Sequence, residues 1–192
     1  NGGTVDVNGT LADTVDVIVA NNNTAIYEVG ATDTIQSLDV GAAGRVVLTA
    51  GLTTGDAGND TIAGVISGTG ALTKQGSGTV TISAAQTFTG DLTVNGGKID
   101  NNSTLADTVD VIVSNNAGSI YEVGATDTIQ SLALAGTNSS VILTAGLTVG
   151  DGNAKTIAGT ISGAGSLTKQ GAGEYTITAA QTFTGDLTIN AG

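Results

Sequence analysis

The chain has 192 residues, of which 17 are acidic and five are basic, and its formal net charge of −12 repels the phosphates that dominate nucleic-acid affinity. Hydrophobic residues make up 40% of the chain, enough to form a core, but no apolar run is long enough to span a bilayer as a helix. With no Cys and no His, the chain excludes disulfides, thiolate metal sites and a Ser-His-Asp triad. We therefore expect neither a nucleic-acid partner nor membrane insertion by this segment.

The sequence is a tandem duplication. Residues 10–38 return largely unchanged as residues 104–132, at an offset of 94. Copy 2 then gains one residue, so that residues 66–97 return as residues 161–192 at an offset of 95. Because the inserted residue is tolerated, residues 41–45 are predicted to form a surface turn. The chain thus divides into copy 1, residues 1–94, and copy 2, residues 95–192.

Short runs that alternate apolar and polar residues predict β-strands along the whole of copy 1. In the clearest run, Val15, Val17 and Val19 point to one side of the strand, whereas Asp16 and Ile18 point to the other. Almost nothing has the period of a helix. The predicted strands cover residues 4–7, 15–19, 25–29, 34–40, 46–52, 61–66, 71–74, 79–82 and 92–94.

A near-verbatim repeat favours a solenoid that grows by stacking turns over a sandwich or a closed barrel. We predict one continuous all-β parallel β-helix of about eight coils, four to a copy, each of roughly 21 to 25 residues. The absence of Pro fits, because every interior strand donates hydrogen bonds to its neighbour. Asn residues at 21–23, 101–102 and 115–116 fall at corners, where they form either stacked ladders or solvated turns.

The segment Gly68-Thr-Gly-Ala-Leu-Thr-Lys-Gln-Gly-Ser-Gly, followed by Gln86-Thr-Phe-Thr-Gly-Asp-Leu-Thr-Val-Asn, resembles the passenger-associated repeat of bacterial autotransporters and related large surface adhesins. Residues 163–192 resemble it again, and Gln86, Gln181, Phe88 and Phe183 replace the family's Asn and Tyr. The resemblance implies a right-handed parallel β-helix exported to a Gram-negative cell surface, and no catalytic residues. The signature positions are Gly70, Leu72, Lys74, Gly76, Gly78, Phe88 and Gly90, and Gly165, Leu167, Lys169, Gly171, Gly173, Phe183 and Gly185.

One segment, residues 55–62, resembles half of the calcium-binding nonapeptide repeat of bacterial toxins. Calcium would take Asp56, Asp60 and turn carbonyls, because hard cations need several oxygen ligands. The match is isolated, however, and copy 2 has Lys155 where the key carboxylate should be. This favours a polar Gly/Asn corner and no metal or cofactor, with calcium as the alternative.

Paired carboxylates for glycan cleavage are the other chemistry that a β-helix could support. The candidates are Asp13 with Asp16 and Glu28 with Asp33, and all four recur in copy 2 as Asp107, Asp110, Glu122 and Asp127. An active site rarely occurs twice on one rod, so duplication favours structural or solubilising roles.

The lysines and aromatic residues of the repeat have other expected roles. We expect Lys74 and Lys169 to form ion pairs at the surface, and Phe88 and Phe183 to cap the core. Tyr27 and Tyr121 could lie either in the core or at the surface.

We therefore expect a non-enzymatic structural segment of a bacterial surface or secreted protein, a rigid stalk or fibre that supports adhesion or assembly. The alternative is a carbohydrate-binding or glycan-processing β-helix. The chain starts at Asn1 without Met and stops mid-pattern at Gly192, so we expect a piece of a longer protein. Its expected partners are flanking repeats of the same protein or end-to-end copies of itself, together with a host or glycan surface.

Overall fold

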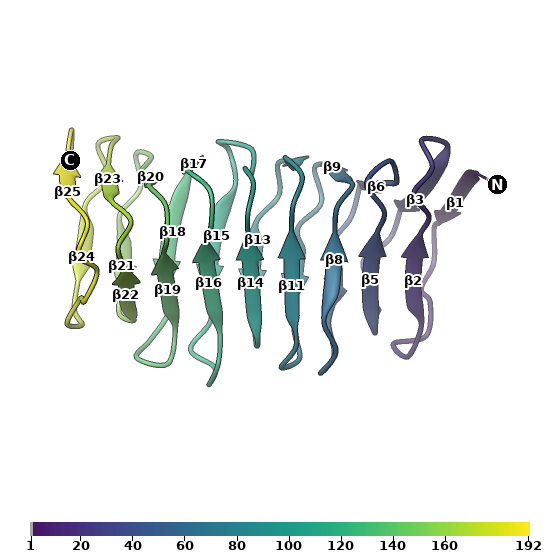
Figure 1. The fold of residues 1–192 in the computed structure, drawn as a ribbon, viewed down its shortest axis with the longest axis horizontal. Coiled ribbons are helices and arrows are strands. Elements are labelled where there is room, and N and C mark those ends of the chain that lie inside the picture. Colours follow the sequence, from purple (N-terminus) through teal and green to yellow (C-terminus); the bar gives the residue numbers. More distant parts are fainter. Residues whose placement is uncertain (1) are drawn as a thin grey trace.

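The structure is a computed structural model that describes residues 2–192; Asn1, the first residue of copy 1, lies outside the described residues. These residues form 25 β-strands and no helix, and every strand pairing among them is parallel. The chain winds into a β-solenoid of about nine turns, with its two ends at opposite ends of the stack (Figure 1). The predicted parallel β-helix is confirmed.

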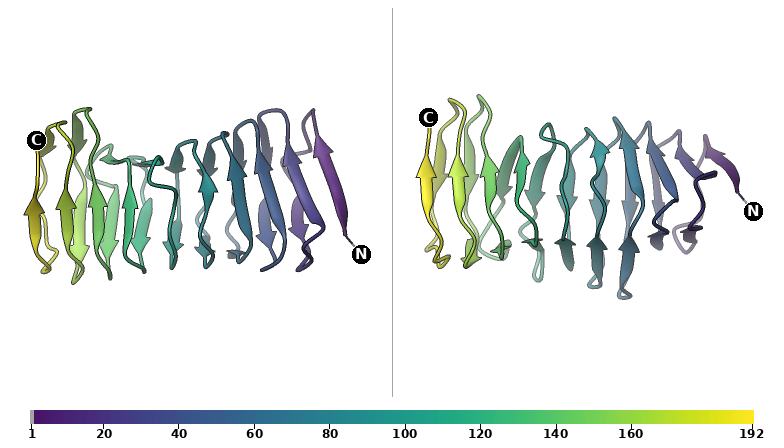
Figure 2. Two further views of the ribbon diagram at one scale, coloured as in Figure 1. Left: turned by 90° about the horizontal axis from the view of Figure 1, so that it is seen from above. Right: turned by 45° about the horizontal axis from the view of Figure 1, so that its top comes forward.

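The strands form four sheets that run along the solenoid (Figure 2). Sheet A consists of β1 (Gly3–Val7), β3 (Ala25–Val29), β6 (Arg45–Leu48), β9 (Val65–Gly68) and β12 (Thr87–Phe88). Sheet B consists of β2 (Asp16–Val19), β5 (Ser37–Val40), β8 (Asp60–Ile62), β11 (Thr79–Ile82), β14 (Lys98–Asn101), β16 (Ile120–Val123), β19 (Ser140–Leu143) and β22 (Thr160–Gly163).

The other two sheets are built in the same way. Sheet C consists of β4 (Asp33–Ile35), β7 (Leu52–Thr54), β10 (Leu72–Lys74), β13 (Leu92–Val94), β15 (Asp110–Val113), β18 (Ser131–Leu134), β21 (Lys155–Ile157) and β24 (Tyr175–Ile177). Sheet D consists of β17 (Asp127–Ile129), β20 (Leu147–Val149), β23 (Leu167–Lys169) and β25 (Leu187–Ile189).

The turns are shorter than the sequence predicted. Leu52, Leu72 and Leu92 pair in succession along sheet C, so that one turn takes 20 residues there. Because most turns are close to this length rather than 21 to 25 residues, the chain completes about nine turns instead of about eight. Of the predicted surface turn at residues 41–45, residues 41–44 lie between β5 and β6, and Arg45 begins β6. The inserted residue of copy 2 lies in the equivalent connection between β18 and β19, so it does not disturb a strand.

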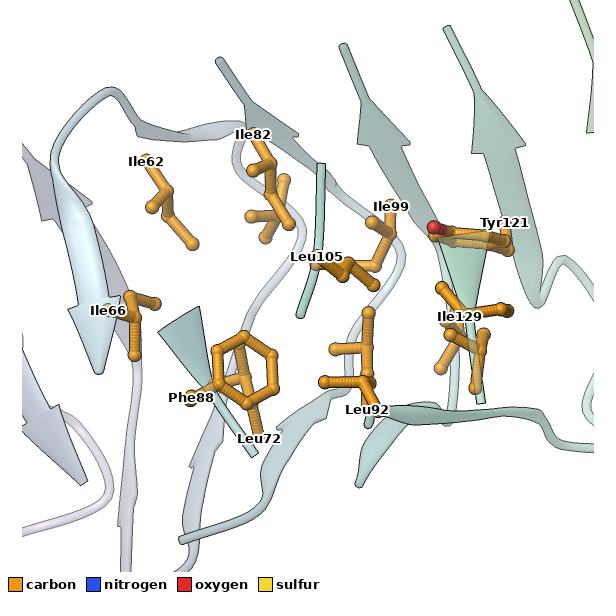
Figure 3. Packing of buried hydrophobic residues seen from close by; sticks show 14 of the residues in the cluster. Ile62, Ile66, Leu72, Ile82, Phe88, Leu92, Ile99, Leu105, Tyr121 and Ile129 are labelled. Atoms are coloured by element: carbon orange, nitrogen blue, oxygen red, sulfur yellow. The ribbon is translucent and has the colours of Figure 1, made fainter. Parts of the chain in front are cut away.

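Side chains that point inward form continuous apolar columns, as strand alternation requires. On β2, Val17 and Val19 point inward, and Ile18 points outward with 76% of its surface exposed. Tyr27 and Tyr121 are both buried, which settles the alternative that the sequence left open. Figure 3 shows part of this core, formed by Ile62, Ile66, Leu72, Ile82, Phe88, Leu92, Ile99, Leu105, Tyr121 and Ile129.

The two copies are rotated relative to each other about the solenoid axis, so that equivalent strands lie in neighbouring sheets. Strands β3 and β6 of copy 1 lie in sheet A, but their equivalents in copy 2, β16 and β19, lie in sheet B. Likewise, β5 lies in sheet B and its equivalent β18 in sheet C. The reason is that a repeat of 94 or 95 residues, at about 20 residues per turn, takes about four and two-thirds turns.

Sheets A and D together form one side, or wall, of the solenoid, with sheet A in its N-terminal part and sheet D in its C-terminal part. Sheet A ends at β12, and the backbone N–H of the adjacent Gln86 donates to the carbonyl oxygen of Thr104 on the next turn at 2.8 Å. The N–H of the buried Leu105 then donates to Asp127, the first residue of sheet D, at 3.1 Å. Residues 103–108 therefore bridge the two sheets, and the solenoid has three walls.

Corner glycines allow consecutive turns to approach closely. A side chain at Gly78 would overlap the carbonyl oxygen of Gly58 on the preceding turn, which is part of the rigid backbone. In contrast, a side chain at Gly152 would meet no atom within 4 Å, and the equivalent residue in copy 1 is Ala57. Close stacking, rather than a positive φ, is what requires glycine at position 78.

We predict that Gly78→Ala lowers the free energy of unfolding by about 2 kcal/mol or more, because the turns at this corner must separate. Gly152→Ala is the matched control and should change it by less than about 0.5 kcal/mol. Urea unfolding monitored by circular dichroism measures both. Equal stability of the two variants would show that turn stacking at this corner is not tight.

Candidate functional site: polar contacts that tie the turns together

The two signature lysines lie inside the solenoid, so the prediction that they are solvated ion-pair partners is wrong. The exposed fraction is 1% for Lys74 and 7% for Lys169. The Lys74 ammonium donates to the carbonyl oxygens of Gln75, Gly76 and Gly96, the last two at 3.2 and 3.3 Å. The Lys169 ammonium makes the equivalent bonds to Gln170, Gly171 and Ala191 at 2.7, 2.8 and 3.1 Å.

Strand alternation explains this placement. Lys74 is the third residue of β10 and points inward like Leu72, directly before a corner whose carbonyl groups lack strand partners. A buried ammonium is tolerated because it is fully hydrogen-bonded, although burial lowers the pKa of Lys74 and the charges of Asp60 and Asp56 oppose that shift. Since Gly96 belongs to the next turn, the lysine links two successive turns.

Gln86 and Gln181 provide a second link between turns. The Gln86 side-chain oxygen accepts the N–H of Ile66 at 2.7 Å, and its amide nitrogen donates to the carbonyl oxygens of Gly64 and Ala84. Gln181 makes the same three bonds to Ile161, Gly159 and Ala179. The side-chain amide of Gln86 thus makes the hydrogen bonds that a backbone peptide group would make beside β12, which is only two residues long.

The remaining signature residues form the core and the corners. Phe88 is fully buried, as predicted, and Phe183 packs against the core at the C-terminal end with part of its ring exposed. Gly90 lies against the carbonyl group of Gly70, and a side chain at Gly90 would overlap it. Gly185 and Gly165 repeat this contact in copy 2. Each signature glycine therefore permits close stacking of the next turn.

A buried network in copy 2 joins two successive turns. The Asn101 side-chain amide donates to the Tyr121 hydroxyl at 3.0 Å and to the carboxylate of Asp127 at 3.2 Å. Burial raises the pKa of Asp127 to about 6, and it raises the pKa of Tyr121 as well. Sequence patterns alone do not reveal this network, because Tyr121 and Asp127 are 20 and 26 residues away from Asn101.

Copy 1 has an incomplete version of the same network. Asp33, the equivalent of Asp127, accepts the N–H of Leu11 at 3.1 Å, as Asp127 accepts that of Leu105. Val7 replaces Asn101, however, and the buried Tyr27 hydroxyl has no hydrogen-bond partner in the described structure. The Tyr27 pKa is raised to about 12 by burial and by the charge of Asp33.

The two calcium candidates play different structural roles. Asp60 points inward from β8, is 5% exposed and has one carboxylate oxygen without a partner, and burial raises its pKa to about 6. Asp56 lies in the corner between β7 and β8 and accepts the N–H of Gly58. Within residues 2–192 no group of three or more His, Cys, Asp or Glu side chains could hold a metal ion. A calcium ion here would need backbone carbonyls for most of its ligands.

The two copies differ at Asp60, whose equivalent in copy 2 is Lys155. β8 pairs with β5 at a single residue pair, and β21 pairs with β18 at a single pair. In copy 1 the backbone N–H of Leu38 opposes the rise in the pKa of Asp60; in copy 2 the N–H of Leu132 donates to the Tyr175 hydroxyl at 3.0 Å. Lys155, which replaces Asp60, instead forms an ion pair with Asp110 at 3.6 Å.

The carboxylates considered for glycan cleavage do not form a facing pair on β3 and β4. Asp33 points into the core with 3% exposure, whereas Glu28 points outward from β3. Asp127 and Glu122 are separated in the same way, and Glu122 forms an ion pair with Lys98 at 2.9 Å. Asp13 and Asp16 are both exposed, and Asp16 accepts the hydroxyl of Ser37 at 2.7 Å.

The Asn corners contain short sets of hydrogen bonds between successive turns rather than a long ladder. Asn21 accepts the N–H of Ala43, and Asn115 accepts the N–H of Asn138, in each case from the following turn. Asn116 donates to the side-chain oxygen of Asn95 at 2.7 Å. Residues 2–192 contain no helix that is long and apolar enough to cross a membrane.

One hollow lies at each end of the described part of the solenoid. A hollow of about 460 Å³ at the N-terminal end is lined by residues of β1, β2 and β3. A hollow of about 160 Å³ at the C-terminal end is lined by residues that include Tyr175, Leu187 and Ile189. Both are open ends of the core, where the next turn would lie.

Comparison with known proteins agrees with this geometry. A family model described as Passenger-associated-transport-repeat matches residues 72–99 and 167–192. The chain carries two passenger-associated-transport-repeats. Each repeat begins at the strand that ends in the buried lysine and includes the glutamine that bonds to the preceding turn. A search of curated proteins and a search of solved structures each found no match.

We predict that Lys74→Met lowers the free energy of unfolding by about 2 kcal/mol or more, because buried carbonyl groups lose their charged donor. Lys98→Met is the matched control, since Lys98 forms a partly exposed ion pair, and it should cost less than about 1 kcal/mol. Urea unfolding at pH 7 measures both. An equal cost for the two variants would mean that the Lys74 bonds contribute nothing specific.

The pH dependence of stability should reflect the buried carboxyls. Because burial raises the pKa of Asp60 from 3.8 to about 6, the folded chain binds more protons than the unfolded chain between about pH 4 and pH 6. This contribution to the free energy of unfolding therefore falls as the pH rises through that window. Asp60→Asn should be about 1 to 3 kcal/mol more stable than the native chain at pH 7 and about equally stable at pH 4.

Thermal unfolding from pH 4 to pH 8 measures this difference. Asp13→Asn controls for the loss of one negative charge, because Asp13 lies on the surface. If Asp60→Asn and Asp13→Asn show the same pH profile, burial does not determine the behaviour of Asp60.

Proposed function

We propose that this chain is a rigid, non-enzymatic β-helical segment of an exported bacterial passenger protein, displayed at a Gram-negative cell surface, where it acts as a stalk that supports adhesion or assembly. The proposal rests on the parallel β-ladders, which continue from turn to turn along the rod. Inside the rod, hydrogen bonds from four side chains join successive turns; the four are Lys74, Lys169, Gln86 and Gln181. The two passenger-associated-transport-repeats support export.

The physical basis of a stalk is that each turn is held by both neighbours. The backbone ladders, the apolar columns and the polar side chains all join residues about 20 positions apart, so bending the rod would break several contacts at once. At a strand spacing of ~4.8 Å, about nine turns give a rod of about 43 Å. The net charge of −12 keeps such rods soluble.

The alternative, a glycan-binding or glycan-cleaving rod, has less support. Tyr27, Tyr121 and Phe88 are buried in the core, so their rings cannot stack on a sugar. Asp16 and Asp110, one equivalent pair of outward carboxylates, accept hydrogen bonds from the hydroxyls of Ser37 and Ser131. They also lie in different walls, on sheets B and C, and so cannot act on the same stretch of one glycan chain.

An adhesion assay separates the two functions. Cells that display the segment alone should adhere no better than bare cells to glycan-coated surfaces, whereas cells that display it with a binding domain fused after Gly192 should adhere. Binding or turnover of glycans by the segment itself, lost in Asp16→Asn with Asp110→Asn, would contradict the stalk. Melting in the presence of a chelator tests calcium separately, and a lower melting temperature would support ligation by Asp56 and Asp60.

A further inference from the structure

Asn95 and Gly96 form an Asn-Gly dipeptide in the corner between β13 and β14, near the middle of the solenoid (Figure 1). Asn95 is exposed there, and the Gly96 N–H has no hydrogen-bond partner within residues 2–192. Asparagine is chemically labile because the next backbone nitrogen can attack its side-chain carbonyl carbon, and glycine, which has no side chain, hinders this attack least. The corner therefore places a nucleophile and an electrophile in adjacent residues.

Asn116, on the following turn, increases the reactivity of this pair. Its side-chain amide donates to the side-chain oxygen of Asn95 at 2.7 Å and to the backbone carbonyl oxygen of Asn95 at 3.1 Å. The first bond polarises the carbonyl that is attacked and stabilises the negative charge that develops on its oxygen. The second bond draws electron density from the peptide group between Asn95 and Gly96, which makes the Gly96 N–H a stronger acid. One amide thus activates both reacting groups.

We propose that Asn95 is a site of spontaneous deamidation that Asn116 promotes. The Gly96 N–H gives its proton to water or hydroxide, and its nitrogen bonds to Cγ of Asn95. The bond from Cγ to the side-chain nitrogen then breaks, and ammonia leaves with a proton from water. The resulting five-membered succinimide takes up one water: opening at Cγ gives aspartate at position 95, and opening at the backbone carbonyl gives isoaspartate.

The reaction alters a contact that joins two turns. The Lys74 ammonium donates to the Gly96 carbonyl oxygen at 3.3 Å, and the Asn95 N–H donates to the Lys74 carbonyl oxygen at 2.7 Å. Isoaspartate adds a methylene to the backbone between these two groups of the corner, so both bonds cannot keep their geometry. The modification therefore weakens the link made by the signature lysine as the protein ages, which goes beyond the stalk function.

Two other corners provide natural comparisons. Asn8 also precedes a glycine, but its amide donates to the carboxylate of Asp6 at 2.9 Å, which makes the side-chain carbonyl carbon of Asn8 a poorer electrophile. Asn190, the equivalent of Asn95 in copy 2, precedes Ala191, whose methyl group hinders the attack. Of the two Asn-Gly dipeptides within residues 2–192, the one at Asn95 has the activating donor.

Mass spectrometry of aged protein tests the proposal. The native chain, Asn116→Ala and Asn116→Asp are incubated at mildly alkaline pH for several weeks and digested with trypsin. Neither substituted side chain can donate a hydrogen bond once the aspartate is ionised. The peptide that ends at Lys98 contains Asn95 as its only asparagine, so replacement of NH₂ by OH is read from its mass, and chromatography separates the isoaspartyl form. Asn8, in a different peptide, is the internal reference.

The substitutions should leave the fold intact, because Asn116 is exposed and both hydrogen bonds of its side chain within the described residues are to Asn95. Circular dichroism checks this, and if one variant loses the native spectrum, the other decides.

We expect aspartate and isoaspartate at position 95 in the native chain, and a conversion rate at least several-fold lower in both variants, with the rate at Asn8 unchanged. No conversion of Asn95 in the native chain would overturn the proposal. An equal or higher rate in a folded variant would also overturn it, since Asn116 would then restrain the corner rather than activate it. So would an equal decrease at Asn8, which would show a general effect of the substitution.

Discussion

The structure depends on one constraint, which is that each turn must lie in parallel register over the preceding turn. A turn of the solenoid has no stable structure alone, since its backbone groups bond to the turns on either side and its inward side chains pack in columns with theirs. All other features follow from this constraint. Glycine is required at Gly78 because of a backbone oxygen on another turn, and the buried side chains of Lys74 and Gln86 bond to atoms of another turn.

The rotation between the copies shows that the length of a turn, rather than the length of the repeat, determines which sheet a strand joins. Because the repeat takes about four and two-thirds turns, equivalent residues lie in different walls: Glu28 lies in sheet A and Glu122 in sheet B. One sequence must therefore fit more than one wall. Similar walls with mostly Val, Ile and Leu inside, and with no Trp, satisfy this requirement. The rotation also places repeated surface residues on different sides of the rod, which suits a stalk better than a single extended binding face.

The two copies show how much the interior tolerates. The Asn101, Tyr121 and Asp127 network of copy 2 is replaced in copy 1 by a version in which Val7 leaves the Tyr27 hydroxyl without a partner. Near β8 and β21, copy 1 buries Asp60, and copy 2 has a hydrogen bond from the N–H of Leu132 to the Tyr175 hydroxyl. Buried polar groups are costly unless they are paired, so these positions are the places where the solenoid loses some stability.

The sequence by itself determined the all-β class, the parallel solenoid, the duplication and the inward side of most strands, because alternation along a strand and glycine at corners are local signals. It could not determine what lies on the turn above. Alternation in Ile26, Tyr27, Glu28 and Val29 leaves two choices, and only the pairing of Tyr27 with Val46 puts the tyrosine inside. The burial of Lys74, the amide contacts of Gln86 and the rotation between copies were likewise decided by tertiary structure. The physical reason is that each depends on the length of a turn, which sets which residues about 20 positions apart become neighbours.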